Sequence, residues 1–209
     1  MSGRSLGGAG ETGLRAVPVL RGPRVALRPP AAGDADAARR IGVHPEIHRF
    51  FGYEVAEWRE LTPVEAGWLV ADLAPSASAV TWVVDAGRGF IGTAALHSFD
   101  PACGSAAYAV GLLVPEVLGR GLGTEVTRLV LAHAFDDLRQ NALTVRVLAF
   151  NSRAIACYAR SGFAFDHREP DAVTLDGVSY ADVLLRLDVE RYRRLAPTWG
   201  AVGDSPASF

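Results

Sequence analysis

The segment at residues 113–125 constrains the fold of this chain most, because it joins a strand pattern directly to a helical pattern. The apolar run at residues 108–114 is typical of a buried strand. Apolar residues after the segment recur at helical spacing, and Gly119, Gly121 and Gly123 between the two patterns permit a tight backbone turn. The chain is therefore expected to place a long helix against a sheet.

The other patterns extend this arrangement to the whole chain. Strand patterns lie at residues 24–28, 79–85, 90–98, 108–114, 144–150, 163–167 and 181–187. Helical patterns lie at residues 35–41, 44–51, 62–73, 121–138 and 152–161. Adjacent strands come first, and helices then separate the later strands. This order predicts an α/β (α+β) sandwich with a central mixed, mostly antiparallel sheet flanked by helices.

Composition excludes several classes of protein. The 209 residues carry 21 basic and 23 acidic side chains and are 49% hydrophobic. The near-neutral charge argues against nucleic-acid binding, and no apolar run reaches the roughly 18–20 residues of a membrane span. With no export-signal pattern and only two cysteines, we expect a cytoplasmic protein with reduced thiols. We expect a flexible leader at residues 1–20, one domain at 21–191 and a tail at 192–209.

The glycine turn is suited to an anion. Successive backbone N–H groups in such a turn can face one side, and the helix that follows adds the positive end of its dipole. A lysine-bearing phosphate loop is excluded because every basic residue is arginine. The Gly-x-Gly-x-Gly spacing also departs from the dinucleotide fingerprint, and the next strand pattern ends at Phe150 without an acid. A pyrophosphate site and a plain tight connection both remain open from the residues alone.

A second informative segment lies at residues 151–163. Asn151 follows a strand pattern and precedes a helical one, so its amide can cap the helix or bind a ligand. Tyr158 lies two helical turns later on the same face. Taken singly, the two residues also fit a plain helix cap and a core tyrosine.

Together, the two segments resemble the GNAT superfamily of acetyl-CoA-dependent N-acetyltransferases, over residues 21–191. The openings at residues 24–29 and 44–52 are similar to the branch that includes ribosomal-protein N-terminal acetyltransferases and small-molecule amine acetyltransferases. The resemblance implies a single GNAT-like domain that transfers an acetyl group from acetyl-CoA to a primary amine by direct attack in a ternary complex. It implies no metal, and His44 and His48 have no third ligand nearby in the sequence.

The resemblance also implies roles for individual residues. Leu113 and Val114 would end the strand that pairs with the pantetheine arm, with a backbone N–H near Leu113 holding the thioester oxygen. Asn151 would bond the pantetheine arm, and Tyr158 would protonate the departing thiolate. The pyrophosphate would bind at Gly119, Arg120, Gly121, Leu122, Gly123 and Thr124.

The general base is left open. Many members of the family carry a glutamate on the strand before the turn, and residues 108–113 contain no acid. His97 and Asp100, near the end of the preceding strand pattern, are catalytic candidates together with Tyr158. Glu54 and Glu57 are further candidates, and each of these polar residues also fits a solvated position without a role.

The sequence says least about which amine accepts the acetyl group. Residues 50–68 are rich in aromatic and acidic side chains, and Phe51, Tyr53, Glu54 and Glu57 are predicted to hold a cationic amine through cation–π and ion-pair contacts. A peptide N-terminus, an aminoglycoside-like antibiotic and a small metabolite amine all fit, and the aromatics also fit an ordinary core. The alternative function is a non-catalytic acyl-CoA-binding module. Exposed edge strands permit a homodimer.

Overall fold

The computed structural model describes residues 17–87 and 89–199 and contains one eight-stranded sheet. The strand order is β1-β2-β3-β4-β5-β6-β8-β7, and neighbours are antiparallel except β5 and β6. The strands are β1 (Leu20–Arg21), β2 (Ala26–Arg28), β3 (Ala79–Asp85), β4 (Phe90–Asp100), β5 (Ser105–Leu112), β6 (Ala142–Leu148), β7 (Ala164–Leu175) and β8 (Val178–Asp188). The predicted mixed, mostly antiparallel sheet is confirmed.

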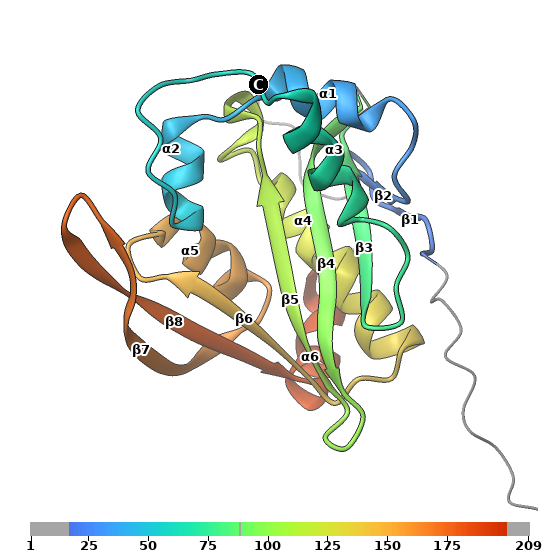
Figure 1. Cartoon of the computed structure of the whole chain (residues 1–209). Helices are drawn as coiled ribbons and strands as arrows, with labels where there is room; N and C mark the ends of the chain where they lie inside the picture. Colours follow the sequence, from blue (N-terminus) through green and yellow to red (C-terminus); the bar gives the residue numbers. More distant parts are fainter. Residues whose placement is uncertain (1–16, 88, 200–209) are drawn as a thin grey trace, which may run out of the picture.

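Helices cover both faces of the sheet (Figure 1). They are α1 (Asp34–Ile41), α2 (Pro45–His48), α3 (Pro63–Ala71), α4 (Leu122–Ala132), α5 (Ser152–Arg160) and α6 (Val189–Leu195), with a short 3₁₀ turn η1 (Arg49–Phe51) after α2. Successive side chains of β3 point to opposite faces of the sheet and pack in two different hydrophobic cores. Trp82 packs with α4 in the larger core, while Val83 packs with α1 residue Ala38 on the opposite face. The flanked sheet of the predicted sandwich is therefore present.

The sheet separates into two parts between β5 and β6. These parallel strands pair only where residues 105–107 face residues 142–144, although both strands continue further. Beyond that point β5 and β6 diverge, and α2 lies above the wide end of the gap (Figure 1). The pairing that stops early opens the space in which the candidate site lies.

Several elements differ from the predicted ones. β7 continues to Leu175 and forms a long hairpin with β8, whereas the pattern predicted a strand that ends at residue 167. Two register shifts and an exposed edge explain the weak signal, since alternation is lost at a bulge. The single helix predicted at residues 121–138 is divided in the structure. It consists of α4 followed directly by a π-helix at His133–Asp137.

The structure near the C-terminal end contains a helix that the sequence patterns did not predict. Helix α6 continues across residue 191, and its Tyr192 packs in the core with Trp199 against it. The boundaries predicted at residues 20 and 191 stay predictions, and residues 1–16 and 200–209 lie outside the described part of the chain. None of the helices at residues 17–87 and 89–199 has the length and apolar character that a bilayer crossing requires.

Candidate active site

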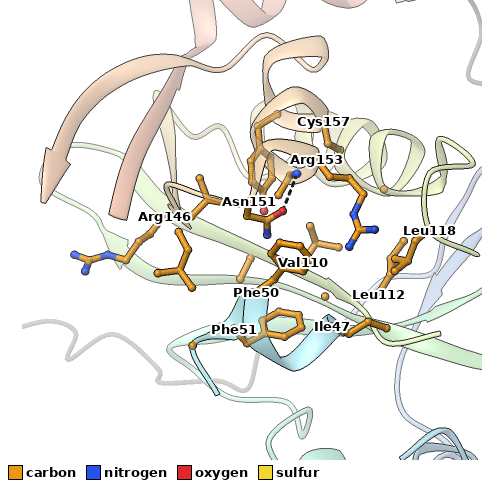
Figure 2. A pocket seen from close by; sticks show the side chains of 18 of the residues that line it. Ile47, Phe50, Phe51, Val110, Leu112, Leu118, Arg146, Asn151, Arg153 and Cys157 are labelled. Carbon is orange, nitrogen blue, oxygen red and sulfur yellow. Dashed lines mark hydrogen bonds between the residues drawn. The ribbon is translucent and has the colours of Figure 1, made fainter. Parts of the chain in front are cut away.

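A cavity of about 550 Å³ occupies the gap between β5 and β6. Its walls come from the α2–η1 segment, the end of β5, the glycine turn, α5 and the β7–β8 hairpin. Figure 2 shows Arg146 at one end of the labelled residues and Leu118 at the other, with Asn151 and Val110 between them. The cavity is therefore elongated, with the glycine turn near one end and the hairpin near the other.

The glycine turn adopts a conformation that favours glycine. Gly119 and Gly121 have φ values of +74° and +80°, a region that other residues rarely enter. Gly121 is also the N-cap of α4, and no side chain caps this helix. The N–H groups of its first turn therefore have no side-chain acceptor, which is the arrangement that binds anions. Arg153 and Arg160 on α5 line the same cavity and add positive charge.

A long-range ion pair holds this turn in place. Glu125, in the first turn of α4, is 6% exposed and accepts hydrogen bonds from the Arg24 N–H at 2.8 Å and the Val25 N–H at 3.2 Å. The Arg24 Nε–H donates to the other Glu125 oxygen at 2.8 Å, and its Nη1 donates to the Arg120 carbonyl at 2.9 Å. The segment before β2 thus fastens both the helix and the turn.

The six residues that the resemblance assigned to the pyrophosphate divide into two groups. Gly119, Gly121, Gly123 and Thr124 line the cavity. The Arg120 carbonyl is engaged by Arg24, and the Leu122 side chain is buried in the larger core. The turn presents backbone and small side chains to the cavity, as a bulky phosphate ligand requires.

Two polar residues of α5 face the cavity. Asn151 Oδ1 accepts the Ala154 N–H at 3.1 Å and so caps the helix, while no described residue accepts from its Nδ2 (Figure 2). Tyr158 is 5% exposed and lies edge-on to Tyr108, with ring centroids 6.2 Å apart. Burial raises the pKa of the Tyr158 phenol, and the nearby Cys157 thiol adds to this effect. The phenol is therefore protonated at neutral pH.

The backbone N–H near Leu113 that the resemblance implies for the thioester oxygen is not the N–H of Leu113 itself. The Leu113 N–H donates to the Ile91 carbonyl at 2.9 Å, so the sheet already uses this donor. Neither Leu113 nor Val114 lines the cavity, whereas Val110 and Leu112 do. Because successive N–H groups of a strand point to opposite edges, the Leu112 N–H points toward the gap rather than toward β4.

The structure does not bring His97 or Asp100 to the cavity. His97 Nδ1 lies 2.9 Å from Ser98 Oγ, and Asp100 accepts the Ala102 N–H at 2.9 Å in the turn after β4. Hydrogen bonds from the Cys103 thiol and from backbone N–H groups lower the pKa of Asp100. Asp100 pairs with Ser105, seven residues before Leu112, or roughly 23 Å along the strand. Neither residue is among those that line the cavity.

The four predicted acceptor residues also divide. Phe51 and Tyr53 line the cavity, and the Phe51 ring lies against Gly111 of β5. Glu54 instead accepts the Asp176 N–H, which fastens its loop to the β7–β8 turn. Glu57 is exposed and lies outside the cavity walls. The aromatic part of the predicted wall is at the cavity, and the acidic part is not.

The acid that does line the cavity, Asp182, is not among the residues predicted from the sequence. Asp182 of β8 is 7% exposed and accepts from Arg146 Nη1 at 3.2 Å. Among the described residues that line the cavity it is the only aspartate, glutamate or histidine. A signal was available, because Asp182 interrupts the apolar strand pattern at residues 181–187.

Comparisons with known proteins agree with this geometry. A family model described as an acetyltransferase (GNAT) domain matches residues 24–164. The aminoglycoside N(6')-acetyltransferase type 1 of Serratia marcescens is 35% identical over 79 residues, 38% of this chain and 38% of that protein. The match thus spans well under half of this curated relative.

Solved structures share the fold at low sequence identity. RimJ of Mycobacterium smegmatis in complex with CoA-disulfide has a TM-score of 0.72 and 21% identity, covering 88% of this chain and 94% of that chain. Spermidine N-acetyltransferase of Vibrio cholerae, in complex with CoA and spermine, has a TM-score of 0.68 and 18% identity, covering 81% and 98%.

Proposed function

Because the chain belongs to the acetyltransferase (GNAT) domain family, we propose that it transfers the acetyl group of acetyl-CoA to a primary amine. One observation carries the proposal: a single cavity has the glycine turn, Asn151 and Tyr158 on its walls together with an aromatic end at Phe51 and Tyr53. A donor thioester and an acceptor amine can therefore meet inside one space.

The donor occupies the part of the cavity nearest the glycine turn. The pyrophosphate binds the N–H groups at Gly121 and the start of α4, and Arg153 and Arg160 add charge complementary to the phosphates. The pantetheine arm lies between the diverging β5 and β6, where the Asn151 Nδ2 donates to it. The Leu112 N–H takes the role of oxyanion donor, since the Leu113 N–H is used by the sheet.

The reaction then needs only these groups and an unprotonated amine. The amine nitrogen attacks the thioester carbon, the new C–N bond forms, and the C–S bond breaks. The Tyr158 phenol donates its proton to the departing thiolate, and the phenolate regains a proton from the attacking nitrogen. Because its pKa is raised by burial, Tyr158 remains protonated until the thiolate forms.

Small cationic amines are the acceptor class that we favour. The curated relative is an aminoglycoside N-acetyltransferase, and one similar structure is a spermidine N-acetyltransferase with spermine bound. A protein N-terminus is the second candidate. The opening at residues 24–29 and the similar fold of RimJ support this candidate.

Two measurements test the proposal. Thermal unfolding with acetyl-CoA, CoA or NAD should give a higher midpoint only with the CoA species, because a ligand at about a hundred times its Kd stabilises a fold by roughly 2.7 kcal/mol. Release of CoA thiol should then be followed with spermidine, kanamycin and a peptide with a free N-terminus. Binding of CoA without turnover of any amine would favour the alternative of a non-catalytic acyl-CoA-binding module.

A further inference from the structure

The end of the cavity farthest from the glycine turn contains one buried carboxylate. Asp182 lines the cavity beside Ala172 and Val173 of β7 and Leu148 of β6. These three neighbouring wall residues are apolar. A carboxylate in such a place is costly to desolvate unless cations or donors surround it.

The hydrogen bonding of Asp182 is incomplete. An ionised carboxylate can accept about four hydrogen bonds, and among the described residues Asp182 accepts one, from Arg146 at 3.2 Å. Arg146 is also shared, because its Nη2 lies 2.6 Å from Glu169 Oε2. The shorter contact goes to Glu169, and the longer contact goes to the buried acid.

Arg146 approaches Asp182 from an open, solvent-exposed position. Its side chain is 56% exposed, and Figure 2 shows its guanidinium pointing away from the other labelled residues. Glu169 lies directly opposite Asp182 across the β7–β8 pair, so two like charges face each other with Arg146 between them. A second cation that enters the cavity would reduce this repulsion further.

We propose that Asp182 binds an ammonium group of the acceptor that is not itself acetylated, a primary ammonium carried on a slender apolar stem. This inference rests on the acetyltransfer function proposed above and names the acceptor class of that same cavity. The ammonium fills the acceptor positions on Asp182 that Arg146 leaves open, and the stem lies along Leu148, Val173 and Phe51. Arg146 remains with Glu169 when the acceptor binds.

Calorimetric titration of the CoA-bound full-length protein tests this assignment without requiring turnover. The probes are hexylamine and hexan-1-ol, which differ mainly in the positive charge. Wild-type protein should bind hexylamine at least about tenfold more tightly than hexanol, as expected for one charge-assisted hydrogen bond. In Asp182→Asn this preference should fall to about threefold or less. The assignment is wrong if wild type has no preference or if D182N retains it.

Glu169→Gln is the matched control, since it makes the same chemical change directly across the strand pair but outside the cavity walls. Because E169Q also frees Arg146 to pair with Asp182, it should lower the preference less than D182N does, and an equal loss in the two variants would overturn the assignment. Arg146→Gln provides a second test that is independent of the folding of D182N. Removal of the competing guanidinium should tighten hexylamine binding by about threefold or more, and weaker binding would contradict the proposal.

These outcomes separate the two proposals. Acetyl transfer with an amine preference that survives D182N would leave the enzyme function standing and remove Asp182 from the acceptor site. A preference that disappears in D182N, without acetyl transfer to any amine, would support the ammonium site and contradict the catalytic function.

Discussion

The buried Glu125 carboxylate offers the sharpest test of how the glycine turn is held. Glu125→Gln keeps the shape of the side chain and leaves one oxygen for the Arg24 and Val25 N–H groups. Its amide NH2 would face the Arg24 Nε–H, donor against donor, so the charged hydrogen bond at 2.8 Å is lost. A hydrogen bond to a charged group contributes about 1.5–3 kcal/mol to the free energy of unfolding. Because Arg24 is half-exposed and solvent screens its charge, the expected loss is about 2 kcal/mol.

Two assays follow from this number. The free energy of unfolding in urea should fall by about 2 kcal/mol, and the thermal midpoint by roughly 4–8 °C. Because Arg24 no longer holds the Arg120 carbonyl, the turn that we propose binds the pyrophosphate should loosen. The KM for acetyl-CoA should rise by about tenfold, while the KM for S-acetylpantetheine, which lacks the pyrophosphate, should stay within about twofold.

The exposed Glu116, just before the turn, supplies the matched control. Glu116→Gln should change neither the unfolding free energy nor either KM. A link between Glu125 and the turn is refuted if E125Q raises both KM values equally, or if E125Q loses stability while the acetyl-CoA KM stays at the wild-type value. Either result would make Glu125 a structural residue without influence on the turn.

Three further outcomes are expected. Tyr158→Phe should lower kcat by about 10²–10⁴-fold with the CoA Kd unchanged, because it removes only the proton donor, and a smaller effect in stopped-flow turnover would contradict that role. Gly111→Ala should raise the acceptor KM with a stability loss below about 1 kcal/mol, since its Cβ would lie 2.9 Å from the Phe51 ring, which must move. Asp34→Asn should lose about 3 kcal/mol of unfolding free energy at neutral pH, because Asp34 is buried and pairs with Arg28 at 2.7 Å. Burial opposes ionisation of Asp34, but hydrogen bonds from Arg28 and the Ala31 N–H outweigh it and lower its pKa below the usual 3.8. The stabilisation by Asp34 is therefore present above that value and lost as pH falls through the lower folded pKa, so the gap between wild type and D34N in urea titrations should close below about pH 4.

Local chemistry accounts for the parts of this protein that could be predicted from its sequence. The cap of α3 is an example, since the Thr62 side chain accepts the Glu65 N–H and the Glu65 carboxylate accepts the Thr62 N–H, as that spacing favours. The turn at Gly119–Gly123 is another, because positive φ at alternate positions selects glycine there. Both features depend on residues within a few positions of each other.

Tertiary structure decided the features that join distant positions. Arg24 and Glu125 are 101 residues apart, and no local pattern pairs them. The Leu113 N–H belongs to the sheet because of the register between β4 and β5, which a one-residue difference would reverse. Asp182 interrupts an apolar strand pattern, but only the pairing of β6 with β8 places it beside the gap. Hydrophobic period and backbone preference act locally, so they predicted most of the helices and strands and the glycine turn. The proposed acceptor end of the cavity depends on strands that only folding brings together.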